Sequence, residues 1–263
     1  MRVSRQSFSI LAVLAVTACA TPAGTPADAP ALEDIRLDRF EWAGELPTNR
    51  RLSVRNAFGN VEARRSNEGN VIVIGNIQQL IADSRVFSID VDASDGISVT
   101  VRHPDAEATD RGLNANGAFA GRVDVVVLVP DGAQLSLHAV HGDVKLKRLT
   151  ADLVASTIDG NMAFDTAGSI QATTLQGNIA ATLRGVRYEK PLLFKTKSGA
   201  IALSLAETAG LNLVLGGGES LTVRRGDEDP ADIPVRMLRL NLGNGGPDLR
   251  ALSETGAVSV EIM

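Results

Sequence analysis

Polar and apolar residues alternate along most of this chain, and the alternation is clearest between His141 and Leu205. Within short segments of this stretch, apolar residues recur at every second position, with charged or small residues between them. A period of two residues is typical of a β-strand buried on one face, whereas a helix needs a period of 3.6 residues. The pattern therefore predicts a chain of short, half-buried strands.

The strands recur in units that are marked by glycine. Four glycines, each followed by an alternating segment, lie 18, 17 and 22 residues apart at Gly142, Gly160, Gly177 and Gly199. Further turn signals near residues 151 and 168 divide the units into two strands each. Two strands and two turns describe one coil of a β-solenoid, in which successive coils stack on each other. We expect glycine at the corner because it adopts a positive φ without strain.

Two other architectures share parts of this pattern. A sandwich of ordinary hairpins also has short strands at regular spacing, but its turns do not normally repeat one glycine register. A calcium-binding roll repeats G-G-x-G-x-D-x-U-x, and most units here lack its second glycine and its aspartate. The sequence favours an all-β fold over residues 34–263, a single-domain β-solenoid with 17 to 22 residues per coil.

The first 18 residues predict an export signal. Arg2 and Arg5 precede an apolar stretch, residues 8–16, that is too short to span a bilayer stably. The sequence Val16-Thr17-Ala18-Cys19 follows, and it resembles the lipobox of bacterial lipoproteins. In those proteins the cysteine becomes the N-terminus and carries acyl chains, so the resemblance implies lipid attachment at Cys19.

Ordinary signal-peptide cleavage near Ala18-Cys19-Ala20 is the alternative to a lipid anchor. With the anchor, Ala20 rather than aspartate after the cysteine implies, by the same resemblance, an outer-membrane destination. Residues 19–33 are rich in alanine and proline without a period, and we expect a flexible tether. Cys19 is the single cysteine of the chain, so no intramolecular disulfide is possible.

The sequence also predicts the structure of four further segments. Residues 34–47, which include Trp42, are expected to cap the N-terminal end of the stack. Residues 76–85 fit the alternation poorly and predict a loop or short helical turn. Residues 104–121 predict an exposed excursion, and the nearly continuous apolar residues 123–129 predict a strand buried on both faces.

The repeat units resemble a known family. The glycine units, the segment Val129-Pro130-Asp131-Gly132 and the closing Gly256-Ala257-Val258 look like the bacterial "putative adhesin" domain family. The likeness covers roughly residues 45–263. That family has no known function, folds as a β-solenoid and occurs on exported proteins and lipoproteins. The resemblance implies the fold and brings no catalytic residue or cofactor to this chain.

Charge and composition limit the classes of partner that this chain is suited to bind. Without residues 1–18 the chain has 24 basic and 31 acidic residues, a net charge of −7, which argues against a nucleic-acid partner. Aromatic residues make up only 3% of the chain, which weighs against a cleft that stacks sugars on rings.

Candidate chemistry is sparse. The histidines are His103, His138 and His141, and the last two lie three residues apart, which places them on opposite faces of a strand. We expect exposed or turn histidines rather than metal ligands. The glycines at 216–218 lack the Lys-Ser/Thr ending of a phosphate loop and predict a tight turn. Residues 225–227 spell the cell-attachment tripeptide Arg-Gly-Asp within an acidic, solvated loop.

Three aspartates carry the case for an enzyme. Asp143, Asp159 and Asp165 lie in different coils and could converge when the coils stack, as carboxylates do in glycan-cleaving β-helices. We instead expect a non-catalytic, membrane-anchored envelope lipoprotein: an adhesin-like binding or scaffold module without a cofactor. Its partner would be a protein or a glycan. A polysaccharide-active enzyme and an envelope-stress regulatory partner are the alternatives.

Overall fold

The computed structural model describes residues 34–81, 87–102, 121–229, 231–232 and 236–263. These residues form two large β-sheets that do not close into a barrel, so the predicted all-β fold is confirmed. No helix within these ranges is long and apolar enough to cross a bilayer. The predicted export signal and tether, Cys19, His103, residues 82–85 of the predicted loop and residues 104–120 of the predicted excursion lie outside the described residues.

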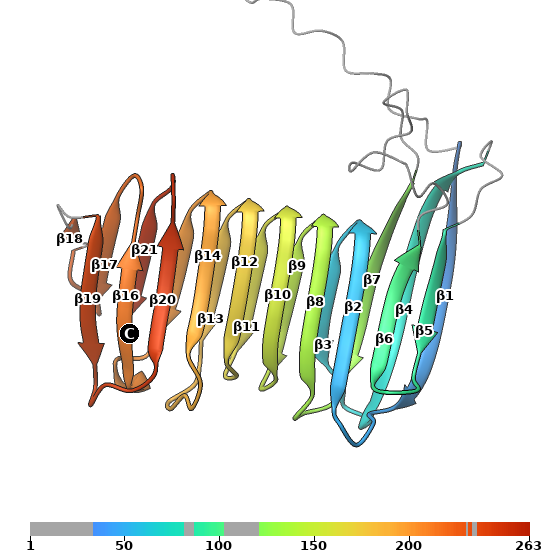
Figure 1. The fold of residues 1–263 in the computed structure, drawn as a ribbon, viewed down its shortest axis with the longest axis horizontal. Helices are drawn as coiled ribbons and strands as arrows, with labels where there is room; N and C mark the ends of the chain where they lie inside the picture. The colour runs from blue at the N-terminus through green and yellow to red at the C-terminus, as the bar shows by residue number, and fades with distance from the viewer. Residues whose placement is uncertain (1–33, 82–86, 103–120, 230, 233–235) are drawn as a thin grey trace, which may run out of the picture.

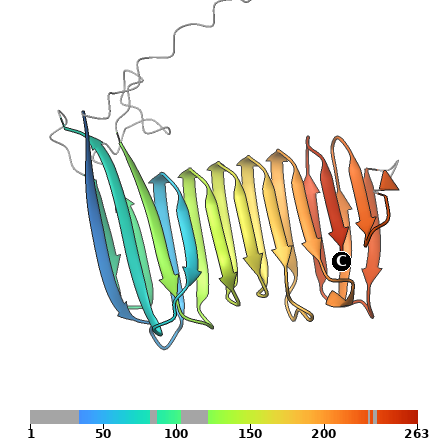
Figure 2. The same ribbon diagram turned by 180° about the vertical axis from the view of Figure 1, so that it is seen from behind.

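The two sheets lie face to face along the whole length of the molecule (Figures 1 and 2). Sheet A contains, in spatial order, β1 (Ile35–Glu45), β4 (Asn70–Leu80), β7 (Arg122–Val129), β3 (Val61–Arg65), β9 (Val144–Leu149), β11 (Met162–Thr166), β13 (Ile179–Leu183), β15 (Ile201–Leu205), β21 (Val258–Ile262), β17 (Leu221–Arg225) and β18 (Ala231–Asp232). Sheet B contains β19 (Met237–Leu242), β16 (Leu211–Gly216), β20 (Asp248–Ser253), β14 (Leu192–Ser198), β12 (Ile170–Gln176), β10 (Asp152–Asp159), β8 (Gln134–His141), β2 (Arg51–Phe58), β6 (Ile97–Arg102) and β5 (Ser88–Asp92).

In the centre of the molecule the chain alternates between the sheets. From β8 to β15, each strand pairs in parallel with the equivalent strand one repeat earlier. We call one strand of sheet B together with the sheet A strand that follows it a rung. Hairpins would place antiparallel neighbours here, so the parallel pairing distinguishes these rungs from a hairpin sandwich. Each predicted glycine unit therefore corresponds to one central rung.

Side chains of equivalent position form columns between the sheets. One column of fully buried residues joins six rungs: Val61, Val144, Met162, Ile179, Ile201 and Val258. Some interior alanines lie beside a phenylalanine, as Ala172 and Ala251 do on either side of Phe194. This alternation of large and small side chains fills the interior, and burial of a side chain such as Phe194 contributes about 1.5–3 kcal/mol.

The glycine corners are required by contact between rungs. A Cβ atom built on Gly160 would lie 2.1 Å from the carbonyl oxygen of Gly142, and one on Gly177 would lie 2.0 Å from that of Gly160. Gly142, Gly199 and Gly256 meet the preceding corner in the same way. A positive φ accounts for glycine at only some of these corners, because Gly160 and Gly256 do not adopt a positive φ. The expectation that glycine is needed at the corner for its positive φ was thus incomplete.

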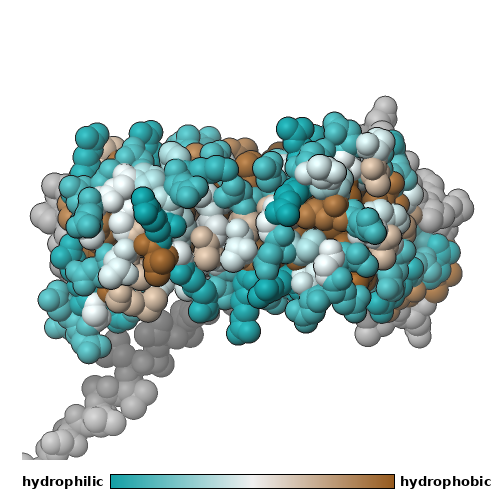
Figure 3. Space-filling model, turned by 90° about the horizontal axis from the view of Figure 1, so that it is seen from below, coloured by the Kyte–Doolittle hydropathy of each residue, from teal (hydrophilic) through white to brown (hydrophobic). Residues whose placement is uncertain are grey.

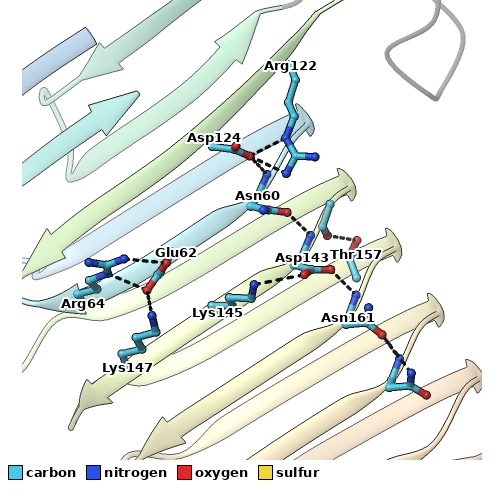
Figure 4. A network of polar contacts seen from close by, with 12 residues as sticks. Asn60, Glu62, Arg64, Arg122, Asp124, Asp143, Lys145, Lys147, Thr157 and Asn161 are labelled. Carbon is cyan, nitrogen blue, oxygen red and sulfur yellow. Dashed lines mark hydrogen bonds and ion pairs between the residues drawn. The ribbon is translucent and has the colours of Figure 1, made fainter. Parts of the chain in front are cut away.

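Two rows of hydrogen bonds fasten each corner to the next. Inside the stack, buried hydroxyls donate to the glycine carbonyl one rung earlier, at 2.7–3.4 Å: Thr157 to Gly142, Thr174 to Gly160, Thr196 to Gly177 and Ser253 to Gly199. Outside the stack, a side-chain oxygen at each corner accepts a hydrogen bond from a backbone N–H of the next rung along the stack (Figure 4). The accepting residues are Asp124, Asn60, Asp143, Asn161 and Asn178. These bonds pair backbone groups at the corner that strand pairing does not use.

Strand order departs from chain order at both ends. The rung β20–β21 lies between β14–β15 and β16–β17, and the rung β2–β3 lies between β6–β7 and β8–β9. Antiparallel strands then end the sheets: β1, β4 and β5 at one end, β18 and β19 at the other. The predicted N-terminal cap is confirmed, since β1 is the edge strand of sheet A and Trp42 packs against the core.

Two expectations about single segments were wrong. Residues 76–80 are not a loop but the end of β4, because pairing with β1 holds them extended through contacts such as Asn76 with Arg39. The strand at residues 123–129, β7, is fully buried on one face only. Its outer residues, such as Val126, are half-buried because β4 and β3 flank them on either side.

The corner contact predicts a large cost for adding one methyl group. Gly160→Ala is expected to destabilise the protein by about 3 kcal/mol or more, because the backbone of the neighbouring rung must move. Gly69→Ala is the matched control: its Cβ would meet nothing within 4 Å, so the positive φ alone costs about 1 kcal/mol. Urea unfolding of the two variants measures the difference, and equal costs would refute the contact explanation.

Candidate functional site

A long groove lies on the outer face of sheet A. It has a volume of about 1000 Å³ and crosses the strands from β9 to β17. Figure 2 shows this sheet from its outer side. We call it the sheet A groove.

Small side chains form the floor of the groove. Ala163, Ala180, Ala202 and Ser259 are exposed, in register and on neighbouring strands. A second row runs beside them, with Thr182 and Ser204 at its centre. Longer side chains stand at both ends, Lys145 on β9 and the ion pair of Arg224 with Glu261 on β17 and β21. The face is hollow because short side chains lie between long ones.

Basic residues gather at the β9 end of the groove. Glu62 on β3 lies between Arg64, at 2.7 Å, and Lys147, at 2.8 Å (Figure 4). Hydrogen bonds from Arg64 and Lys147 outweigh partial burial and lower the pKa of Glu62 from 4.5 to about 2. Two cations therefore share one carboxylate. Lys145, which lies on β9 as Lys147 does, pairs with Asp143 at 3.4 Å.

Arg148 reaches the groove through an irregularity in β9. The pairing register of β9 with β11 shifts by one residue here, so Arg148 is an extra residue in its strand. Its φ of 54° lies in the left-handed region, which side chains rarely adopt. Such bulges re-aim a side chain and are common beside functional sites. Arg148 lines the groove, and among the described residues it makes no ion pair or side-chain hydrogen bond.

The three aspartates named from the sequence each have other partners. Asp143 accepts a hydrogen bond from the backbone N–H of Asn161, Asp159 lies 3.7 Å from His141, and Asp165 pairs with Arg184. Of the three, Asp165 alone lines the sheet A groove. Within the described ranges, no three His, Cys, Asp or Glu side chains are grouped to hold a metal ion.

The two described histidines are half-buried rather than exposed. His138, on the outer face of sheet B, lies between the hydroxyls of Ser136, at 2.7 Å, and Ser156, at 2.6 Å. Burial, followed by the charge of Arg55, lowers the pKa of His138. His141 stacks on Phe58 with ring centroids 5.3 Å apart.

The serine–histidine cluster was missed from the sequence. Its signal was the 18-residue spacing between His138 and Ser156, which matches the repeat and places them side by side. A serine nucleophile also needs an oriented base and donors for an oxyanion. Among the described residues no carboxylate is bonded to His138, and the backbone N–H groups around it are used in pairing β8 with β2 and β10.

Two short motifs lie at the C-terminal end of the stack. Gly216 ends β16, and Gly217 and Gly218 lie in the predicted turn between β16 and β17. The Arg-Gly-Asp tripeptide is exposed: Arg225 ends β17, and Gly226 and Asp227 lie in the turn that follows. Gly226 donates its N–H to the carbonyl of Ile262 at 2.8 Å.

Neither a protein-family model nor a curated protein matches this sequence. Solved structures do match. One is described as a putative cell adhesion protein from Clostridium sporogenes, with 10% identity over 86% of this chain and 100% of that chain, and a TM-score of 0.44. Putative adhesins from Parabacteroides distasonis (12%, 86% and 97%, TM-score 0.33) and Bacteroides fragilis (10%, 86% and 97%, TM-score 0.31) also match. These descriptions name the kind of protein that the sequence resembles.

The position of Glu62 predicts a pH-dependent loss of stability. The ionised carboxylate is favoured in the folded state, so its stabilisation is present above about pH 4.5 and is lost as the pH falls towards 2. Glu62→Gln should reduce stability at pH 7 by about 2 kcal/mol and flatten the stability profile between pH 5 and 2. Glu219→Gln, which changes an exposed carboxylate that has no ion pair with any described residue, should leave stability at pH 7 unchanged. Urea unfolding across this pH range measures both, and a parallel profile for Glu62→Gln would contradict the assignment.

Proposed function

We propose that this protein is a non-catalytic, lipid-anchored module of the bacterial cell envelope, built as an adhesin-like β-solenoid that presents a binding surface. The observation that carries the proposal is the outer face of sheet A, where small and hydroxyl side chains line a long groove and Asp165 and Glu261 are held in ion pairs. An enzyme of this architecture would need unpaired carboxylates that converge.

The stacking supports the solenoid and its use as a platform. Successive central rungs pair in parallel, and each corner is bonded to the next on its inner and outer sides. Such a row holds its surface side chains at fixed spacing. Binding to a rigid surface loses less conformational entropy than binding to a mobile one.

The position of β1 supports display from a tether. β1 begins at Ile35 and lies at one end of the row (Figure 1). A tether over residues 19–33 would therefore join the domain at its end and leave the outer faces of both sheets accessible. Seen from below, the surface is mostly hydrophilic, with small separate hydrophobic patches (Figure 3). This surface is suited to an aqueous envelope compartment.

The anchor is tested by changing the proposed attachment residue. Cys19→Ala should move the protein from the membrane fraction to the soluble fraction, because acyl chains contribute about 0.8 kcal/mol for each buried CH₂ group. Ala20→Asp is the matched variant: it keeps the cysteine and should stay membrane-bound while shifting from the outer to the inner membrane. Fractionation after a salt wash, with mass analysis of the N-terminal peptide, measures both. Cys19→Ala that still sediments with membranes would refute the anchor.

A further inference from the structure

The sheet A groove is positively charged, although the chain as a whole is acidic. Six basic and two acidic side chains line it. With the ion-pair partners of these residues, Glu62, Asp131, Asp143 and Arg184, the groove has seven basic and five acidic side chains, a formal charge of +2, whereas the full chain carries −5. Both acidic residues of the lining already pair with arginines. A surface that reverses the sign of its protein is suited to a ligand of the opposite charge.

The excess of positive charge is concentrated at the β9 end. Arg64 and Lys147 share Glu62, and Arg148 adds a third cation without an ion pair within the described residues. The bulge in β9 places Arg148 on the groove instead of continuing the alternation of the strand. An anionic group bound here would meet more cations than the protein itself neutralises.

The groove is elongated along the row of strands. It crosses β9, β11, β13, β15, β21 and β17, a length of about 24 Å at the usual strand spacing. Hydroxyl groups of Thr182, Ser204 and Ser259 lie along it, beside the methyl groups of the alanine floor. The shape therefore fits an extended chain that has polar groups on its edges and C–H groups towards the floor.

A sugar chain fits these groups better than a peptide does. A ligand in the groove crosses strands whose backbone N–H and C=O groups are already paired with neighbouring strands. A peptide could not add to the sheet as a further strand, and its own backbone groups would go unpaired on the alanine floor. Sugar hydroxyls can exchange hydrogen bonds with serine and threonine, and sugar carboxylates can pair with arginine and lysine.

We propose that the sheet A groove binds an acidic polysaccharide, with a carboxylate of the sugar chain at Arg148 and the neighbouring basic side chains. This inference rests on the proposed function as a binding module, but it does not require the lipid anchor. Because charge rather than ring stacking supplies the attraction, the complex should weaken as salt is added. The low aromatic content of the chain is compatible with such binding.

The test uses the full-length protein in detergent with sodium polygalacturonate as the probe. Calorimetric titration should show binding at low salt that weakens at high salt, and no binding of neutral dextran. Arg148→Gln should weaken the affinity roughly five-fold, whereas Arg148→Lys should retain most of it. Ala180→Glu, which adds a negative side chain to the exposed floor, should abolish binding. Lys195→Gln removes an exposed charge from the outer face of sheet B and should change nothing.

Three results would overturn the inference: no binding of polygalacturonate, tighter binding of poly-L-glutamate, or equal losses from Arg148→Gln and Lys195→Gln. Melting temperatures of all variants show that each remains folded. Fractionation of Cys19→Ala is scored separately, so a failure of the anchor is distinguishable from a failure of the groove.

Discussion

The structure depends on the contact between one glycine corner and the next. Parallel rungs stack at the ordinary strand spacing, and at the corner this spacing leaves no room for a Cβ between Gly160 and the carbonyl of Gly142. A hydroxyl inside and a side-chain oxygen outside then bond across the same junction: Thr157 donates to the carbonyl of Gly142, and Asp143 accepts from the backbone N–H of Asn161. Because a slip of one residue would turn every side chain to the other face, this junction fixes the pairing register of both sheets.

A fixed register also determines the surface. Inside the stack it aligns large residues with small ones, as with Phe194 between Ala172 and Ala251. Outside, it aligns short side chains into the floor of the sheet A groove. The groove therefore follows from the same columns that build the core, and one additional residue in β9 suffices to turn Arg148 towards it.

Much of the fold could be predicted because stacked rungs leave a periodic trace in the sequence. The corners at Gly142, Gly160, Gly177 and Gly199 were placed correctly, and the strands between them follow from alternation. The end of β4 and the strand order at both ends could not be predicted, since neighbours in space there are not neighbours in sequence. The groove was missed, although two adjacent charged residues before Leu149 are a visible trace of the bulge.

The insertion of rung β20–β21 between β14–β15 and β16–β17 affects how the protein reaches its native state. Residues 248–262 separate two rungs that precede them in the sequence, so these two have no interface of their own. The stack therefore cannot assemble in the order in which the polypeptide leaves the ribosome. Insertion of the rung β20–β21 is therefore the final step of folding. This step is slow, because its contacts join segments that are distant in the sequence and must meet before they stabilise each other.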